Sequence, residues 1–315
     1  MSWETTLDQK ITDYLPELKW LRDEPLARHT SFRIGGPAKR MAFPKTAEEL
    51  IVLDGFLREA GARTVLLGNG TNVLFPDGGL DAVVVATGEL KEVRHIGDTE
   101  LSADAGVSLA RLATEAWQAG LTGLEFAHGI PGSLGGGVVM NAGAYDGALA
   151  DVLTEVTALF PDGVRTLKAE DLQLSYRHSI FTEQPEAVVL RATVRLRAGE
   201  PDAIKTRMDE LMEKRRRSQP LEYPSAGSTF KRPAGHFAGR LIEDAGLKGA
   251  RVGGAEVSPK HAGFIVNAGG ATPEDVFRLI RAVQKRVYEK DGVRLEPEVE
   301  LLGDFLCEEE LPWNS

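Results

Sequence analysis

The sequence contains an unusually dense glycine cluster. The nine residues GIPGSLGGG, from Gly129 to Gly137, include five glycines and lie within the longer run EFAHGIPGSLGGGVVMNAGAYDG. Because glycine loses more backbone entropy on folding than any other residue, such a cluster needs a structural or functional reason. A second glycine-rich loop, LGNGTN at Leu67–Asn72, follows the apolar segment RTVL. Either loop alone is typical of a tight turn, but two such loops favour a phosphate-containing cofactor held by backbone N–H groups.

Neither loop fits the common nucleotide-binding motifs. The dinucleotide fingerprint GxGxxG is absent, because Gly68-Asn69-Gly70 is followed by Val73 and the second loop has the spacing GxxGxxG. The chain also contains no GK[ST] and therefore no P-loop. The residue pattern by itself does not identify the cofactor.

Composition and charge exclude several classes of protein. The 315 residues suffice for two or three domains, and the net charge of −10 argues against nonspecific binding to nucleic acid or to anionic membranes. The single cysteine, Cys307, rules out an intrachain disulfide, and the six histidines lack metal-ligand spacing, so we expect no metal site. The N-terminus MSWETTLDQK lacks the features of a signal peptide, and the apolar runs are too short to cross a bilayer. We therefore expect a cytoplasmic protein.

Helix-like and strand-like segments alternate along the chain and predict an α+β fold. Residues 1–30 read as a helical leader followed by a loop. Apolar periodicity predicts the other helices at 48–61, 108–120, 204–217, 236–246 and from Pro273 onward. Alternating or continuous apolar runs predict strands at 63–72, 80–87, 190–197, 261–267 and 292–303, a strand pair at 90–106 and a hairpin at 153–167.

Two of the predicted strands have distinct faces. In the strand at 190–197, the inward residues are Leu190, Ala192, Val194 and Leu196, and the outward residues are Arg191, Thr193, Arg195 and Arg197. In the strand at 292–303, one face carries Leu295, Val299 and Leu301, and the other carries Glu296, Glu298 and Glu300.

Eight ordered blocks resemble the UDP-N-acetylenolpyruvoylglucosamine reductase (MurB) family of flavoproteins. They cover nearly the whole chain and read HTSFRIGGPA (29–38), LGNGTNVL (67–74), GLEFAHGIPGSLGGGVVMNAGAY (123–145), SYRHSIF (175–181), YPSAGSTFKRP (223–233), HFAGRLIE (236–243), KHAGFIVN (260–267) and LEPEVELLG (295–303). The 51 residues between Arg177 and Ser228 resemble the shorter form of the family, which lacks an inserted segment carrying a tyrosine that closes over the substrate.

The resemblance implies a fold and a cofactor. The fold is an α+β FAD-binding module of the vanillyl-alcohol-oxidase-like (PCMH) type with two subdomains, followed by a smaller α/β substrate-binding domain. The expected boundaries are 1–88 for the leader and first subdomain, 89–212 for the second, 213–303 for the substrate domain and 304–315 for a tail. Noncovalent FAD would be held by Gly68, Asn69, Gly70, Thr71, Asn72, Gly132, Ser133, Gly135 and Gly136, with Asn141, Ala142 and Gly143 near the flavin. The glycines would then be required because the pyrophosphate and the flavin approach the backbone closely.

The resemblance also implies a reaction. The family uses NADPH to reduce an enolpyruvyl ether on UDP-N-acetylglucosamine to UDP-N-acetylmuramate, a precursor of cell-wall peptidoglycan. Negative charge develops on the substrate carboxylate, which Arg177 would bind with two hydrogen bonds. Ser228 would protonate the α-carbon, and Glu298 would stabilise the enolate or orient Arg177. Spacing alone does not choose Glu298 over Glu296 or Glu300.

The substrate contacts are less specific in the sequence. We expect Tyr176, Lys231 and Lys260 to bind the substrate, the two lysines at its phosphates. Tyr223 is a candidate for the residue that closes over the substrate. The basic run EKRRR (213–217) suits either a phosphate site or a solvated helix C-terminus. His128 and His178 lie in the blocks but are typical of structural residues. Gly137, where alanine is commoner, and Asp146, which separates Tyr145 from Gly147, depart from the family pattern at positions that tolerate change.

Two other functions remain open at this point. A related flavin oxidase or dehydrogenase would be expected to lack the blocks around the catalytic trio or to link its flavin covalently, for which Cys307 is badly placed. A catalytically silent flavin-binding or UDP-sugar-binding regulator would keep the glycine loops and lose the trio. In each case we expect a small-molecule ligand, no nucleic acid or membrane partner, and a monomer or weak oligomer.

Overall fold

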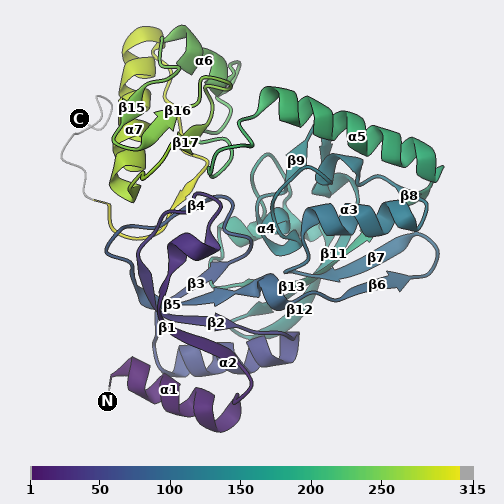
Figure 1. Ribbon diagram of the computed structural model, residues 1–315. Helices are drawn as coiled ribbons and strands as arrows, with labels where there is room; N and C mark the ends of the chain where they lie inside the picture. The colour runs from purple at the N-terminus through teal and green to yellow at the C-terminus, as the bar shows by residue number, and fades with distance from the viewer. Residues whose placement is uncertain (1, 306–315) are drawn as a thin grey trace. The chain divides into compact units, whose positions relative to one another are not determined.

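The computed structural model describes residues 2–305 and divides into two compact units (Figure 1). Within the described residues, unit 1 comprises 2–21, 40–69 and 82–215, and unit 2 comprises 22–39, 70–81 and 216–305. The boundaries after residues 88 and 212 and the start of a tail at residue 304 stay predictions. Most of that tail, with Cys307, lies outside the described residues.

The first sheet has four strands in the order β1-β2-β5-β3. Its strands are β1 (Lys19–Pro25), β2 (Pro37–Phe43), β3 (Thr64–Leu67) and β5 (Leu80–Ala86), and the N-terminal helices are α1 (Trp3–Tyr14) and α2 (Ala47–Glu59). Strand β3 pairs with β5 in parallel. The predicted stripe of α2 is confirmed, since Leu50, Leu53 and Leu57 are its buried residues. These leucines pack in unit 1 with Leu7 and Ile11 of α1.

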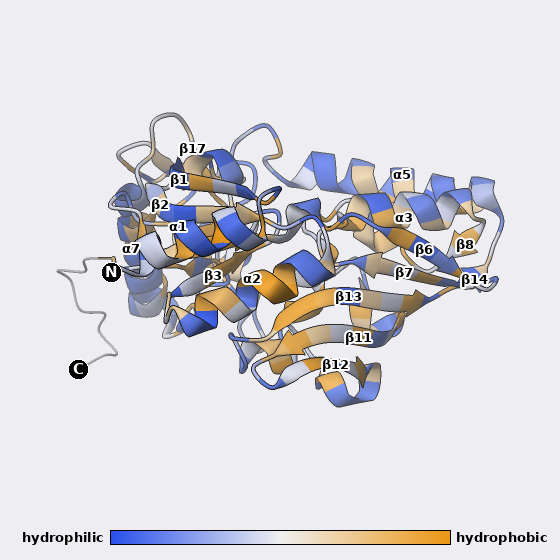
Figure 2. Cartoon of the chain, turned by 90° about the horizontal axis from the view of Figure 1, so that it is seen from below, coloured by the Kyte–Doolittle hydropathy of each residue, from blue (hydrophilic) through white to orange (hydrophobic). Residues whose placement is uncertain are grey.

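The second sheet lies in unit 1 and is antiparallel, with the order β12-β11-β13-β7-β6. Its strands are β6 (Val93–Ile96), β7 (Glu100–Asp104), β11 (Leu153–Phe160), β12 (Gly163–Lys168) and β13 (Val188–Arg195). The predicted hairpin at 153–167 is confirmed by the pairing of Phe160 with Gly163. Figure 2, which colours residues by hydropathy, shows that β11 and β13 are largely apolar.

The expected faces of β13 are partly wrong. The four inward residues of the predicted strand at 190–197 are all buried, but Leu190 packs in one cluster and Ala192 and Val194 in another. The cause is a β-bulge, because neighbouring residues of β11 pair with Val189 and Arg191 and leave Leu190 between them. Thr193, predicted to face outward, is also buried and donates a hydrogen bond to Ser102 at 3.1 Å.

Helices and short strands complete unit 1. The helices are α3 (Leu109–Gln118), α4 (Leu134–Val139) and α5 (Pro201–Ser218), and the strands are β8 (Leu121–Thr122), β9 (Gly143–Ala144), β10 (Gly147–Ala148) and β14 (Arg197–Ala198). Helix α3 begins after the N-cap Ser108, as predicted, and buries Leu109 and Leu112. Strands β9 and β10 form a hairpin whose tip is Tyr145-Asp146. This hairpin contacts the 3-10 turn Glu125–Ala127, which precedes the second glycine loop.

Unit 2 contains two helices and two small sheets. The helices are α6 (Ala238–Asp244) and α7 (Pro273–Asp291), and the strands are β4 (Val73–Leu74), β15 (Arg251–Val252), β16 (Ala255–Val257), β17 (Ile265–Asn267) and β18 (Glu300–Leu301). Strands β15, β16 and β17 are antiparallel, and β18 pairs with β4 in parallel. The predicted strand at 292–303 is regular only at β18. Its apolar face is nevertheless confirmed, because Leu295 and Val299 are buried and Leu301 packs against them.

Helix α7 begins at a complete capping box. The hydroxyl of Thr272 accepts a hydrogen bond from the N–H of Asp275, whose carboxylate accepts from the N–H of Thr272 at 3.0 Å. The same carboxylate accepts from the N–H of Gly254 at 3.2 Å, in the β15–β16 turn. Partial burial acts to raise the pKa of Asp275, but the hydrogen bonds from Thr272 and Gly254 outweigh it and lower this pKa.

Replacement of Asp275 by Ala is expected to destabilise α7 by about 1–2 kcal/mol, because two N–H donors lose their acceptor. A lowered folded-state pKa means that the carboxylate stabilises fully above the ordinary value of 3.8 and loses this effect as the pH falls further. Hydrogen exchange of the α7 amides measures both effects. Glu274→Gln, which removes an ion pair with Arg278 in the same turn, is the control and should change exchange little. Equal exchange in both variants would contradict the capping role.

Within residues 2–305, no helix is both long enough and apolar enough to span a membrane.

Candidate active site

The two glycine loops meet inside unit 1. A Cβ on Gly68 would lie 2.4 Å from Oγ of Ser133, and the side-chain amide of Asn69 donates to the carbonyl of Pro131 at 3.2 Å. Segments more than sixty residues apart are therefore side by side, as a shared ligand would require.

Several glycines of these loops are required by the protein's own packing. Gly70 has φ +60°, and a Cβ there would lie 2.0 Å from the carbonyl oxygen of His29. A Cβ on Gly135 would lie 2.9 Å from Cβ of Ala105, and one on Gly137 would lie 3.0 Å from Leu149. The expectation that a cofactor excludes these side chains therefore needs correction, because protein atoms already exclude them. At Gly137 the close atoms are the ends of the Leu149 and Leu109 side chains, which can adjust, so this position tolerates an alanine.

The second loop donates many of its N–H groups to the protein. The N–H of Leu134 donates to Val107 at 2.7 Å, and that of Gly135 to Ala105 at 2.8 Å. Ser133 is the N-cap of α4, and its hydroxyl accepts from the N–H of Gly136 at 3.4 Å. These contacts fix the turn from the loop into the helix. Around Gly136, by contrast, the Cα face is open, because a Cβ there would meet only Oγ of Ser133, at 3.6 Å.

Asn141 connects the second loop to the segment that carries Arg177. Its side-chain amide donates to the carbonyl of Ser175 at 3.0 Å and its Oδ1 accepts from the N–H of Ala150 at 3.0 Å. Ser175 and His178 exchange two backbone hydrogen bonds, of 3.1 and 3.2 Å, and so close a tight turn. The position of Asn141 near the flavin stays a prediction, and in the structure its buried side-chain amide holds this turn in place.

Arg177 lies at the tip of that turn in an uncommon conformation. Its φ of +54° is in the left-handed region, which costs a non-glycine residue about 1 kcal/mol or more. Its guanidinium lies 5.2 Å from the ring centroid of Tyr176, whose side chain is 57% exposed. Strained backbone of this kind occurs often at functional sites, where the surrounding structure fixes it.

Ser228 and Glu298 lie on neighbouring segments of unit 2. The N–H of Glu298 donates to the carbonyl of Thr229 at 2.8 Å, and the N–H of Lys231 donates to Glu296 at 2.9 Å. Thr229 is buried, and its own N–H donates to the carbonyl of Gly263 at 2.8 Å. Its hydroxyl accepts from the N–H of Ile265 at 3.0 Å. The sequence did not single out Thr229, although its place beside Ser228 in SAGST could have marked it as an anchor.

Asn72 anchors the segment of Glu298 from the other side. Its side-chain amide donates to the carbonyl of Glu298 at 3.0 Å, and its own carbonyl accepts from the N–H of Glu300 at 2.9 Å. Unit 2 thus brings together the end of the first glycine loop, Ser228 and Glu298. Arg177 belongs to unit 1.

The two lysines predicted to bind substrate phosphates already have protein partners. Lys231 forms an ion pair with Glu296. Lys260 donates to the carbonyl of Arg216 at 2.7 Å and lies 3.6 Å from a carboxylate oxygen of Glu222. Their roles toward a substrate remain predictions, and binding would require each lysine to exchange or share these contacts.

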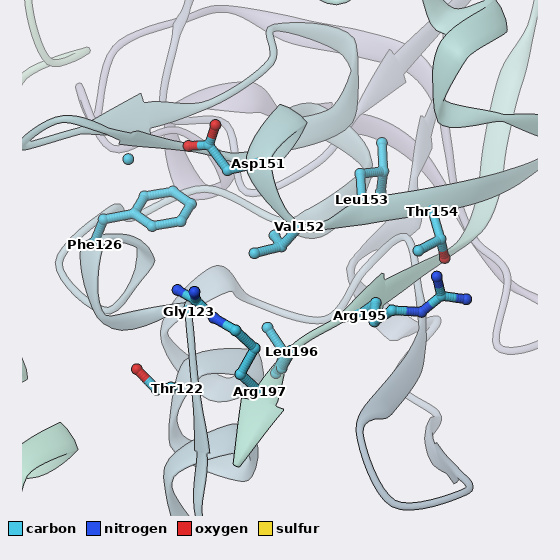
Figure 3. Close-up of a pocket in the computed structure, with 11 residues that line it drawn as sticks. Thr122, Gly123, Phe126, Asp151, Val152, Leu153, Thr154, Arg195, Leu196 and Arg197 are labelled. Atoms are coloured by element: carbon cyan, nitrogen blue, oxygen red, sulfur yellow. The ribbon is translucent and has the colours of Figure 1, made fainter. Parts of the chain in front are cut away.

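Unit 1 also contains a pocket of about 670 Å³ on the side of β8, β11 and β14. Its walls mix apolar and charged side chains and include Phe126, Val152, Leu196, Asp151 and Arg197. Figure 3 shows Arg197 extending toward Phe126, whereas Arg195 points toward Thr154. The pocket borders the segment that precedes the second glycine loop, and none of the predicted site residues lines it.

Known proteins match the chain over nearly all of its length. Residues 38–167 match the FAD binding domain family, and residues 219–302 match the family described as UDP-N-acetylenolpyruvoylglucosamine reductase, C-terminal domain. A UDP-N-acetylenolpyruvoylglucosamine reductase of Caldanaerobacter subterraneus is 49% identical over 95% of this chain and 98% of that relative. The reductase of Pediococcus pentosaceus is 46% identical over 95% of this chain and 99% of the relative.

A solved structure agrees with the sequence relatives. The crystal structure of UDP-N-acetylenolpyruvylglucosamine reductase (MurB) from Thermus caldophilus superposes with a TM-score of 0.76 and 37% identity, covering 90% of this chain and 98% of that one. These findings confirm the expected α+β fold with an FAD-binding module followed by a smaller C-terminal domain. The chain belongs to the UDP-N-acetylenolpyruvoylglucosamine reductase family.

Proposed function

We propose that the protein is an NADPH-dependent flavoenzyme that reduces enolpyruvyl-UDP-N-acetylglucosamine to UDP-N-acetylmuramate, in the cytoplasm, for peptidoglycan synthesis. The observation that carries this proposal is the match to reductases at 46–49% identity over about 95% of the chain. The neighbouring positions of Ser228 and Glu298 in unit 2 support it. A flavin oxidase or a silent binding protein would not need this pair.

The residues of the glycine loops fit FAD. The open Cα face of Gly136 and the contact between the two loops in unit 1 support a pyrophosphate site there. The N–H groups of Leu134 and Gly135 have protein acceptors, so we assign the phosphate contacts chiefly to Gly68–Asn72, Gly132 and Ser133. When bound, FAD supplies the redox chemistry that passes a hydride equivalent from NADPH to the β-carbon of the alkene.

The protein's own residues control the charge and the proton. As hydride reaches the β-carbon, electron density moves to the α-carbon and into the carboxylate, where Arg177 binds it with two charge-assisted hydrogen bonds. Ser228 then transfers its hydroxyl proton to the α-carbon, and a proton from solvent restores the hydroxyl. The overall change is the addition of one hydride and one proton across the double bond. Glu298 stabilises the enolate or orients Arg177.

Consumption of NADPH that depends on the enolpyruvyl substrate is the direct test. In D₂O the product should carry one deuterium at its α-carbon, because the proton there comes from an exchangeable hydroxyl. Oxidation of NADPH at the same rate without the substrate would point instead to an oxidase. Binding of FAD without any product would support a silent regulator.

Replacement of Asn141 by Ala is expected to lower kcat by about ten- to a hundredfold, because the turn that carries Arg177 loses its anchor at Ser175. The flavin content should stay near that of the unchanged protein. Asn69→Ala is the contrasting variant, because Asn69 lies in the loop assigned to the FAD phosphates and its amide holds the carbonyl of Pro131. It should lower the flavin content and leave kcat per bound flavin little changed. Loss of flavin from the Asn141 variant would instead support the cofactor contact that the sequence predicted.

A further inference from the structure

The basic run at 213–217 contains one arginine that differs from its neighbours. Arg215 is half-buried near the end of α5 and packs against the second glycine loop. A Cβ on Gly129 would lie 3.2 Å from Cδ of Arg215 and 3.8 Å from its Nη1. The run EKRRR was compatible with either a phosphate site or a solvated helix C-terminus. Because Arg215 packs against the protein, the second interpretation does not apply to it. Arg216, next to it, is exposed.

The guanidinium of Arg215 has no counter-charge in this setting. Among residues 2–305 it makes no hydrogen bond and no ion pair, and burial lowers its pKa with only the neighbouring Tyr145 acting against this. Lys231 and Lys260, by comparison, each have a carboxylate nearby. A half-buried cation without a protein partner is only partly solvated, and an anion from outside the described chain would offset that cost.

Two further polar atoms in the same part of unit 1 lack partners. The hydroxyl of Tyr145 and Nδ1 of His128 are buried without a hydrogen-bond partner among the described residues. Tyr145 lies at the tip of the β9–β10 hairpin with φ +52°. The hairpin packs closely on Phe126, because a Cβ on Gly147 would lie 2.7 Å from its ring. His128 directly precedes Gly129, on which Arg215 packs.

We propose that Arg215 and the hydroxyl of Tyr145, with His128 beside them, form a subsite for a phosphate group of a nucleotide substrate. A guanidinium matches the spacing of two phosphate oxygens, and a phenol hydroxyl donates to a third. Arg177 is assigned to the substrate carboxylate, so this subsite takes the other anionic part of the ligand. The inference rests on the proposed function, which supplies two nucleotides with this chemistry, the UDP-sugar and NADPH.

Binding measurements on the FAD-loaded protein test the subsite directly. Arg215→Gln should weaken binding of UDP, measured by calorimetry, or of NADPH, measured from the concentration dependence of anaerobic flavin reduction, by about ten- to a hundredfold. Arg215→Lys should recover part of this loss, because it keeps the charge and loses the paired donors. Tyr145→Phe should have a smaller effect in the same direction. The rate of flavin reduction at saturating NADPH should change little.

Arg216→Gln is the matched control, because it removes the adjacent exposed cation of the same run. Weaker binding of UDP alone assigns the subsite to the UDP-sugar, and weaker binding of NADPH alone assigns it to the dinucleotide. Unchanged affinity for both, or a change in FAD content only, would overturn the proposal. Because UDP binding can be measured without turnover, it tests the subsite separately from the proposed function. A protein that fails to reduce the enolpyruvyl substrate but loses UDP affinity on Arg215→Gln would refute the proposed function and keep the subsite.

Discussion

Replacement of Ser228 by Ala is expected to slow reduction of the enolpyruvyl substrate by about 10²- to 10⁴-fold, the usual contribution of a positioned general acid. Reduction of the flavin by NADPH should be unaffected, because that half of the reaction requires no proton at the substrate α-carbon. The fold around the residue should survive, since Thr229, rather than Ser228, makes the backbone and hydroxyl contacts that hold this segment.

Stopped-flow measurement of the two half-reactions separates these effects. Ser225→Ala is the control, because its hydroxyl lies three residues away and accepts only a weak hydrogen bond from the N–H of Gly227, at 3.4 Å. Ser228→Cys should retain part of the activity, since a thiol can donate a proton. Reoxidation of the flavin by substrate at an unchanged rate in Ser228→Ala would show that another group is the proton donor.

Replacement of Arg177 by Gln is expected to have the second large effect on the rate of substrate reduction. We expect kcat to fall by about 10²- to 10³-fold, because the charge on the substrate carboxylate grows in the transition state and, in the role proposed for it, the guanidinium of Arg177 binds that carboxylate. The KM for the substrate should rise less than kcat falls, since the ground-state carboxylate is already charged and loses the smaller part of the interaction.

Arg177→Lys distinguishes charge from geometry. A lysine keeps the positive charge but cannot form two parallel hydrogen bonds, so its activity should lie between those of the Gln variant and the unchanged enzyme. NADPH-dependent flavin reduction serves as the internal control in each variant. A rise in KM with an unchanged kcat would mean that Arg177 binds the ground state and transition state equally, which contradicts its assigned role.

Local signals in the sequence predicted the helices well. Helix α3 begins at Ser108 and α7 at Thr272, where side-chain caps satisfy the first N–H groups. The apolar stripe of α7 is buried as its periodicity indicates, at Val276, Leu279, Ile280, Val283 and Val287. Helix capping and apolar periodicity depend on residues only a few positions apart in the sequence, so both signals can be read from a single sequence.

The strands were harder because their pairing is not local. Residues 1–30 were expected to form a helix and a loop, and the structure adds β1 at Lys19–Pro25. Its alternation is masked by charged residues, and its strand conformation depends on pairing in a sheet rather than on its own composition. The bulge at Leu190 likewise depends on how β13 pairs with β11.

The family resemblance proposed the residues of the site, whose roles stay predictions, but it could not give their contacts. The sequence could name Ser228 and Glu298, whereas the backbone hydrogen bond from Glu298 to Thr229 appears only in the fold. The glycines were attributed to a cofactor, yet Gly70 and Gly135 are crowded by protein atoms. Arg215 could not be told from its neighbours in EKRRR, because only tertiary packing buries it.

The central claim is tested most directly by the visible spectrum of the purified protein under anaerobic conditions. We expect a flavin band that bleaches when NADPH is added and returns when enolpyruvyl-UDP-N-acetylglucosamine follows, which establishes both half-reactions in one sample. A band that bleaches and stays bleached would show that the flavin site is correct and the substrate is wrong. The absence of any flavin band after FAD has been supplied would contradict the account of both glycine loops.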